Sequence, residues 1–310
     1  MYRFCAAVRD LLLNIAIIFA SYASLPITGW DVIKTSLCSL FNKKTHVPRV
    51  VAITGSSSGI GEGIAHAFAE DGVSLVLIAR DLERLNKVAR DCKELGSPNV
   101  KTVQLDVTDT QAVYAQLPEK ILEYNVDLFI ANAGIAFIPE TPILDQAEDV
   151  FQLNVLGTIA CVNAAYKSMK QRGRGGQIAA VSSGGVFFAP AFMVAYTASK
   201  AAVMSYCRDL RVLGKDDGIT VNTIAPGYID TPMTAVLPKK VGSLYITAEK
   251  HGRLVKRSLE EDVPVISFPS YQYLSLSMIS ALPPAVKQIA ARLVHFIADP
   301  VFRDRYKVDK

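Results

Sequence analysis

The sequence predicts a single doubly wound α/β domain, with a parallel sheet covered by helices on both faces. Apolar, β-branched segments of strand length alternate with amphipathic segments of helix length. A glycine-rich turn at Thr54–Gly61 directly follows the first of these strands. No repeat or low-complexity linker interrupts the alternation from residue 47 to 268, and a domain of this size can bury a core.

The elements follow in order along the chain. Apolar runs bounded by glycine, proline or polar residues predict the strands, at Val47–Thr54, Val73–Ala79, Val100–Leu105, Val126–Ala131, Gly176–Val181, Thr220–Ile224 and Val263–Phe268. Helical periodicity predicts a helix from the glycine turn to about Gly72, a second over Leu82–Leu95 and a charged one over Ala248–Asp262. Helical stretches also precede the strands at 176 and 220.

The amino terminus differs in kind from this domain. Leu11–Trp30 carries no charge for 20 residues, about the length that crosses a bilayer as a helix. Three interpretations stay open: a signal or interfacial anchor, a cleaved signal peptide, or a buried accessory helix. We expect residues 1–46 to be an anchor and linker, attached to the endoplasmic reticulum membrane. The basic excess after the apolar run favours a cytosolic position for the folded domain.

The carboxyl-terminal residues 269–310 form an apolar and basic extension. Ser267–Pro284 is uncharged and broken by prolines, and a basic amphipathic helix is expected after it. This extension could lie on a membrane surface, cap a substrate pocket or pack on the sheet.

Composition excludes several classes. With 20% charged and 50% hydrophobic residues, the chain is too apolar to be disordered. A net charge of +4 gives no reason to expect a nucleic-acid partner. The five cysteines are scattered without a CxxC pair, which argues against a disulfide framework and a zinc site, so no metal is predicted.

The glycine turn predicts a site for a dinucleotide pyrophosphate. Gly55 would permit the tight turn, Gly59 the close approach of the backbone to phosphate, and Gly61 close helix packing. The helix that follows directs free N–H groups and a partial positive charge at the anion.

The end of the second strand bears on which dinucleotide binds. An acidic residue there holds the ribose hydroxyls of NAD, whereas an arginine accommodates the extra phosphate of NADP. The chain has Arg80 followed by Asp81. Arg80 favours NADP, Asp81 keeps NAD possible, and Arg80 could also be a solvated surface charge.

Tyr196 and Lys200 lie four residues apart in Y-T-A-S-K, with Ser183 upstream. On a helix this spacing puts the phenol and the ammonium on one face. A nearby cation lowers the pKa of a phenol toward the range of a useful general acid.

These motifs, with N-A-G at Asn132–Gly134, Asn154 and P-G at Pro226–Gly227, resemble the short-chain dehydrogenase/reductase family, in order and at family spacing. The resemblance implies one Rossmann-type domain with a seven-stranded parallel sheet. It also implies four catalytic residues, namely Asn154, Ser183, Tyr196 and Lys200.

The resemblance further implies their roles. Tyr196 would be the general acid in reduction and the base in oxidation. Lys200 would lower its pKa and hold the nicotinamide ribose, Ser183 would bond the substrate oxygen, and Asn154 would hold a water. The cofactor would be bound by Gly55, Ser57, Ser58, Gly59, Ile60, Gly61, Arg80, Asp106, Val107, Asn132, Gly134, Tyr196, Lys200, Pro226, Gly227, Ile229 and Thr231.

Among these, Asp106 would contact the adenine, and Ile229 and Thr231 the nicotinamide carboxamide. Ser58 departs from the family pattern, because several NADP-dependent members have a basic residue there. The expectation of NADP therefore rests on Arg80.

The sequence thus predicts a membrane-associated, NADP-preferring oxidoreductase that interconverts a carbonyl and an alcohol. A substrate loop over Pro232–Lys250 is rich in apolar residues, which favours a lipophilic substrate of the keto-lipid, sterol or retinoid class. The alternatives are a catalytically silent nucleotide-binding scaffold or regulatory protein at a membrane, and a lipid-surface interaction protein. Homo-oligomers are common in the family, so one is possible here.

Overall fold

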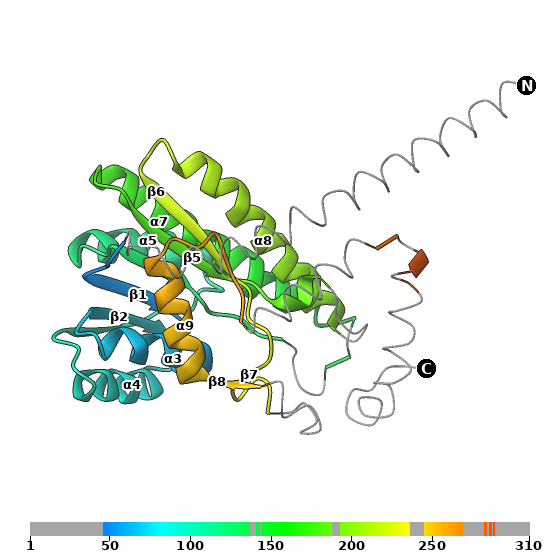
Figure 1. The fold of residues 1–310 in the computed structure, drawn as a ribbon, viewed down its shortest axis with the longest axis horizontal. Helices are drawn as coiled ribbons and strands as arrows, with labels where there is room; N and C mark the ends of the chain where they lie inside the picture. The colour runs from blue at the N-terminus through cyan, green and yellow to red at the C-terminus, as the bar shows by residue number, and fades with distance from the viewer. Residues whose placement is uncertain are drawn as a thin grey trace, which may run out of the picture.

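Seven parallel strands form one sheet, in the order β3-β2-β1-β4-β5-β6-β9 (Figure 1). Its strands are β1 Val50–Thr54, β2 Ser74–Ala79, β3 Val100–Gln104, β4 Leu128–Ala131, β5 Gly176–Val181, β6 Ile219–Ile224 and β9 Val265–Ile266. The order of the strands reverses at the pair β1 and β4, because β2 and β3 lie on one side of this pair and β5 and β6 on the other. In sheets of this kind, ligands are expected at the carboxyl ends of the two strands where the order reverses. The predicted doubly wound fold is confirmed.

The computed structural model describes residues 46–136, 141–142, 144–187, 193–235 and 245–268, with 282–283, 285–286 and 288. The predicted membrane segment Leu11–Trp30 lies outside the described residues, as does nearly all of the predicted C-terminal extension. In the described part of the chain, no helix has both the length and the apolar character needed to span a bilayer.

Helices cover both faces of the sheet (Figure 1). One buried cluster joins the sheet to α3, α4 and α9, and the other joins it to α5, α7 and α8. Their bounds are α3 Gly59–Ala69, α4 Leu82–Glu94, α5 Thr110–Glu123, α7 Thr158–Arg172, α8 Val194–Gly214 and α9 Ala248–Glu260. Because both faces are covered, the central strands are apolar throughout, with β1, β4 and β5 almost wholly buried.

Three short helical segments and a small second sheet complete the described chain. They are α6 Ala147–Phe151, the π-helix η1 Gln152–Gly157, the 3₁₀ turn η2 Gly184–Val186, and the paired strands β7 Ile229–Asp230 and β8 Ile246–Thr247. The predicted substrate loop therefore ends earlier than Lys250, because the Thr247 hydroxyl caps α9 by accepting from the Lys250 N–H. Residues 236–244 of that loop lie outside the described part.

Some predicted strands are longer than the observed ones. The strand expected from Val47 begins at Val50, because the N–H groups of Arg49 and Val50 donate to the Asp127 carboxylate. The strand expected over Val263–Phe268 has ladder partners only at Val265–Ile266.

Helices α3 and α9 touch through their backbones. A Cβ atom on Gly252 would lie 2.1 Å from the carbonyl oxygen of Gly63, and one on Gly63 would lie 2.3 Å from the carbonyl oxygen of Ala248. No side chain fits at this crossing. The contact brings α9, which follows β8, directly against the helix that begins at the glycine turn.

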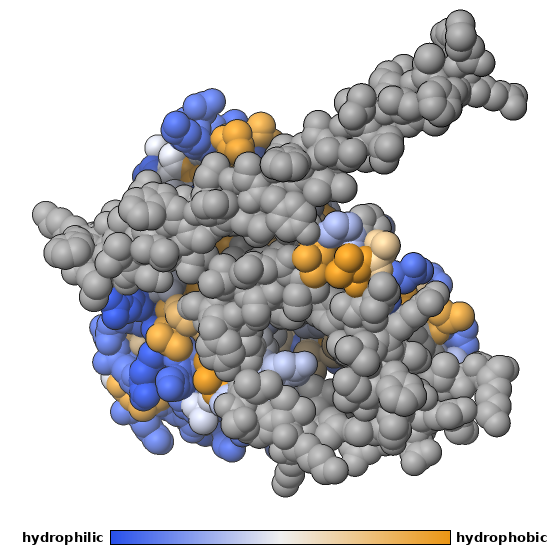
Figure 2. Space-filling model, turned by 45° about the vertical axis from the view of Figure 1, so that its right-hand side comes forward, coloured by the Kyte–Doolittle hydropathy of each residue, from blue (hydrophilic) through white to orange (hydrophobic). Residues whose placement is uncertain are grey.

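The described surface is of mixed polarity. Figure 2 shows small groups of hydrophobic side chains set among hydrophilic ones on the described part of one face. Scattered exposed apolar residues of this kind are ordinary for folded domains.

Candidate active site

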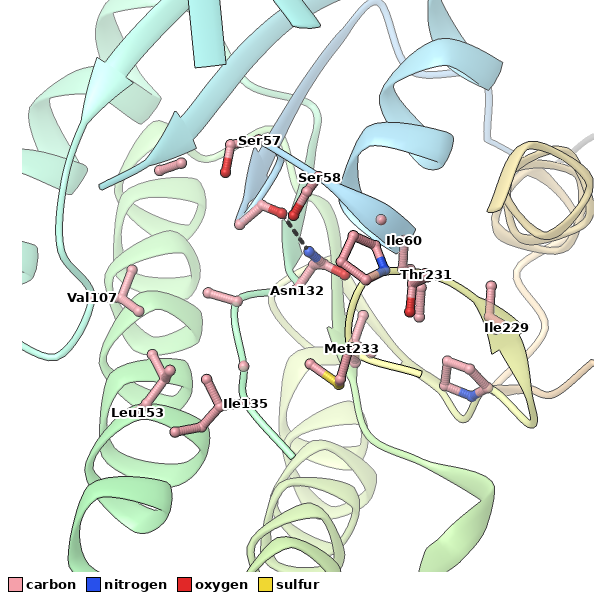
Figure 3. A pocket seen from close by; sticks show the side chains of 18 of the residues that line it. Ser57, Ser58, Ile60, Val107, Asn132, Ile135, Leu153, Ile229, Thr231 and Met233 are labelled. Atoms are coloured by element: carbon pink, nitrogen blue, oxygen red, sulfur yellow. Dashed lines mark hydrogen bonds between the residues drawn. The ribbon is translucent and has the colours of Figure 1, made fainter. Parts of the chain in front are cut away.

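A cavity of about 390 Å³ opens at the carboxyl ends of the parallel strands, within the size range of small-molecule sites. Its walls come from the segments that follow β1 to β6. In Figure 3, Val107, Ile135 and Leu153 lie together on one side, while Ile229, Thr231 and Met233 lie on another. Side chains distant in the sequence therefore surround one space.

The glycine turn bends sharply at the edge of this cavity. Gly55 and Gly59 have φ angles of +64° and +61°, a region that side-chain-bearing residues rarely adopt. A Cβ atom on Gly61 would lie 2.4 Å from the carbonyl oxygen of Gly55, so the helix can begin this close to the strand only without a side chain. The turn leaves the start of α3 facing the cavity through Ser58, Gly59 and Ile60.

Hydrogen bonds fix this turn to the neighbouring strand β4. The Asn132 amide donates to the carbonyl oxygens of Thr54 and Gly55, both at 3.0 Å. The Thr54 hydroxyl accepts from the main-chain N–H groups of Asn132 and Ala133. Asn132 therefore holds the shape of the turn.

Two arginines, Arg80 and Arg84, line the cavity at the end of β2. Asp81 also lines it, but its carboxylate accepts the main-chain N–H of Arg84 at 3.0 Å and caps α4. The guanidinium of Arg80 lies 3.7 Å from the carboxylate of Asp106. Two cations and two carboxylates thus meet at this end of the cavity.

Asp106 remains a carboxylate at neutral pH. Burial raises the pKa of Asp106, but hydrogen bonds from the Thr108 N–H and hydroxyl and the charge of Arg80 outweigh burial and leave the pKa below its ordinary value. The side chain is held in place by Thr108, with its outer edge toward Arg80.

Tyr196, Ser183 and Lys200 all line the cavity from α8 and the end of β5. Burial raises the pKa of Tyr196, and a hydrogen bond with Ser183 opposes that increase. The phenol therefore stays protonated at neutral pH in this structure. Ser183 and Tyr196 both line the cavity, where a substrate oxygen could accept hydrogen bonds from both hydroxyls.

Lys200 is 3% exposed, and its ammonium donates to the Val181 carbonyl at 2.9 Å. Burial lowers the pKa of Lys200 to about 8. The groups that shift the Tyr196 pKa here are its buried surroundings and Ser183. The expected lowering of the phenol pKa by Lys200 stays a prediction.

Asn154 is fully buried in the π-helix η1, behind the cavity wall. Its side chain accepts from the Ile135 N–H at 2.9 Å and donates to the Ile135 carbonyl at 2.8 Å. It also donates to Ser199 at 3.0 Å. Single-turn π-helices often mark functional sites. Here the bonds of the side chain hold protein groups; its expected role in holding a water stays a prediction.

The structure brings most of the predicted residues together. All of them line the cavity except Gly61 and Asn154, which support the turn and the wall from behind. Sequence reasoning missed Arg84, Ile135, Leu153 and Ser182, which also line it. Of these four, Arg84 is the one that the sequence pattern could have predicted, because it lies about one helical turn after Arg80.

A doubly wound sheet with a glycine turn and a Tyr–Lys pair at one cavity defines a nucleotide-binding domain built for redox chemistry. The short chain dehydrogenase family model matches residues 49–242, and the chain belongs to this family.

The chain is also similar to individual proteins that are named dehydrogenases. The chain is 34% identical to 11-beta-hydroxysteroid dehydrogenase 1A of Arabidopsis thaliana, over 71% of this chain and 61% of that protein. It is 36% identical to cis-4-hydroxycyclohexanecarboxylate dehydrogenase of Sinomonas cyclohexanicum, over 71% of this chain and 88% of that protein. The match thus spans less than two thirds of the plant relative. Among solved structures, an alcohol dehydrogenase of Thermococcus sibiricus, complexed with 5-hydroxy-NADP, superposes with a TM-score of 0.61 at 28% identity, covering 71% of this chain and 94% of that one.

Proposed function

We propose that this protein is an NADP-preferring oxidoreductase that interconverts a carbonyl and an alcohol on a lipophilic substrate. One observation carries the proposal: Ser183, Tyr196 and Lys200 line the same cavity as the glycine turn. The residues present fit a dinucleotide, because the start of α3 faces the cavity and the N-cap residue Ser58 makes no side-chain capping bond, so the first N–H groups of the helix could receive the pyrophosphate.

In the reduction direction, a nicotinamide cofactor supplies the hydride to the carbonyl carbon. Ser183 donates a hydrogen bond to the substrate oxygen and stabilises the charge that develops there. Tyr196 donates the phenolic proton to the same oxygen, which completes the alcohol. In oxidation Tyr196 takes that proton back, and the ammonium of Lys200 stabilises the phenolate.

The arginine pair supports the preference for NADP. Arg80 and Arg84 line the end of the cavity where the second strand stops, which is where an adenosine ribose lies in folds of this kind. Asp81, which follows Arg80 in the sequence and would favour NAD, is engaged in capping α4. A doubly charged phosphate between two guanidinium groups gains charge-assisted hydrogen bonds that a ribose hydroxyl does not make.

Apolar walls support a lipophilic substrate. Ile135, Leu153 and Met233 line the cavity beyond the glycine turn (Figure 3), and Met233 begins the segment expected to cover the substrate. The name of the plant relative specifies a hydroxysteroid, which agrees with this class. We include in the proposal attachment to the endoplasmic reticulum membrane through residues 1–46, with the active site facing the cytosol, and association into homo-oligomers.

The test is oxidation of NADPH and NADH by the purified full-length protein, with a panel of hydrophobic ketones and a panel of small polar sugars. We expect turnover with NADPH and the hydrophobic ketones. Turnover confined to sugars would remove the lipophilic substrate. Equal dissociation constants for NADPH and NADH would remove the preference for NADP.

Variants make the cofactor test sharper. Arg80→Ala should weaken NADPH binding by about 10- to 100-fold, the loss of one charge-assisted contact of about 1.5–3 kcal/mol. Binding of NADH should change little, because it lacks the phosphate. Arg90→Ala is a matched control, since this exposed arginine of α4 does not line the cavity.

A further inference from the structure

We propose that Glu62, His66 and Asp91 form a binding site for a divalent cation of the zinc class, which ties helix α3 to helix α4. None of the three lines the cofactor cavity. In the described part of the chain, this is the group of histidine, cysteine and acidic side chains whose ligand atoms come close enough to share an ion. The proposal is independent of the catalytic reaction.

The backbone presents the three side chains to one point. Glu62 and His66 lie four residues apart on α3, so they project from one face of that helix. Asp91 lies on α4, which packs against α3. Their ligand atoms lie within 4.8 Å of one another. Ligands about 2.0–2.2 Å from a shared zinc ion are at most about 4.3 Å apart. Small side-chain rotations therefore complete the geometry.

The three side chains have no other polar partner among the described residues. No hydrogen bond or salt bridge joins any of them to another group there, and the Nε2 atom of His66 is buried without a partner. A buried unpaired polar group costs about 1–3 kcal/mol. A metal ion bound at His66 Nε2 would remove this cost and would also neutralise two carboxylates held near each other.

The surroundings favour a cation. Glu70 and Glu249 also lie near His66, so four acidic side chains surround one imidazole. Arg253 pairs with Glu70 and offsets one of these charges. The remaining local charge is negative and attracts a divalent ion.

The donor set narrows the class of ion. Cys92 lies next to Asp91 but is fully buried, and its sulfur is not among the three ligand atoms that come together. One imidazole nitrogen and two carboxylate oxygens suit Zn²⁺ and its spectroscopic substitute Co²⁺, whereas Mg²⁺ and Ca²⁺ prefer oxygen ligands alone. All three residues are partly exposed, so water can complete the coordination.

The experiment titrates Co²⁺ into the full-length protein after treatment with EDTA, and follows visible absorption. The displacement of bound Co²⁺ by added Zn²⁺ and the midpoint of thermal unfolding are measured as well. We expect one equivalent of Co²⁺, displaced by Zn²⁺, and a rise in the thermal midpoint, because an ion that binds only the folded state stabilises it.

His66→Ala and the pair Glu62→Gln with Asp91→Asn should weaken this binding by at least about 10- to 100-fold, the range already seen when only an outer-shell partner of a metal ligand is lost. Glu83→Gln removes a charge from the exposed face of α4 and should bind as the wild type does. Far-UV circular dichroism and NADPH binding verify that each variant folds. Absence of the Co²⁺ band in the wild type, or an unchanged titration in the His66 variant, would overturn the site.

Discussion

The side-chain amide of Asn154 donates a hydrogen bond of 3.0 Å to the hydroxyl oxygen of Ser199. The Ser199 hydroxyl in turn donates to the main-chain carbonyl of Tyr196 at 2.7 Å. The π-helix is thereby connected to the first turn of α8, which carries the candidate general acid. Asn154 also holds both main-chain groups of Ile135 on the cavity wall.

Replacing Asn154 by alanine should destabilise the protein. Asn154→Ala leaves the half-buried N–H and carbonyl of Ile135 without this partner, at up to about 1–3 kcal/mol for each group left unsatisfied. Ser199→Ala breaks the connection to Tyr196 but leaves Ile135 paired with Asn154, so the free energy of unfolding should fall by less in this variant. Urea denaturation measures both free energies of unfolding. Equal values for the Asn154 variant and the wild type would contradict this role.

A side chain at Gly134 should disturb catalysis. A Cβ atom there would lie 3.0 Å from both the Oδ1 atom of Asn154 and the Nζ atom of Lys200, so these two groups must shift. We expect Gly134→Ala to lower kcat/KM by at least about tenfold, because small misplacements at an active site are costly. Gly173→Ala is the control for lost stability alone, because its φ of +72° disfavours a side chain although its Cβ would meet nothing within 4 Å. If both variants keep wild-type kcat/KM, the packing argument fails.

The crossing of α3 and α9 should tolerate no methyl group. In Gly252→Ala the new Cβ would lie 2.1 Å from the carbonyl oxygen of Gly63, and main-chain atoms cannot rotate away. The helices must separate, which costs about 1–3 kcal/mol or more. A lowered thermal midpoint is the expected readout, and an unchanged midpoint would show that the two helices are free to move apart.

His251 should make stability depend on pH. The side chain is fully buried, and neither ring nitrogen has a hydrogen-bond partner among the residues that the structure describes. Burial lowers its pKa from 6.5 to about 4. Between these values the unfolded chain binds the proton more readily than the folded one. Its contribution is therefore intact above pH 6.5 and is lost as pH falls toward 4, on the order of 3 kcal/mol in total.

His251→Leu isolates this effect, because leucine fills similar space and does not titrate. Its free energy of unfolding should change less between pH 7 and pH 4.5 than that of the wild type. At pH 7 the variant should be no less stable, since two buried unpaired nitrogens are removed. Identical pH dependence in both proteins would contradict the assignment.

Local patterns made much of this site predictable. The glycine turn lies within eight residues of chain, and Tyr196 and Lys200 share one helix, so their geometry follows from sequence spacing. The apolar strands were equally visible, because both faces of the sheet are covered. Even Gly61 could be placed, since its packing partner, Gly55, belongs to the same turn.

Contacts between distant segments escaped prediction. Nothing in the sequence around Gly252 reveals that Gly63 is its partner. The capping role of Asp81 was missed although the helix was predicted to begin at Leu82, as it does, because Asp81 was considered only as a ligand of the NAD ribose. The bonds of Asn154 to Ile135 require a π-helix, which has no periodicity signal of its own.

The most direct test of the central claim is turnover by Tyr196→Phe, beside a measurement of NADPH binding by the same variant. The substitution removes the hydroxyl that donates the proton and keeps the ring that lines the cavity. The account predicts a loss of kcat of at least about 100-fold, the range of general acid–base catalysis, with the NADPH dissociation constant nearly unchanged. Turnover retained near the wild-type rate would contradict it.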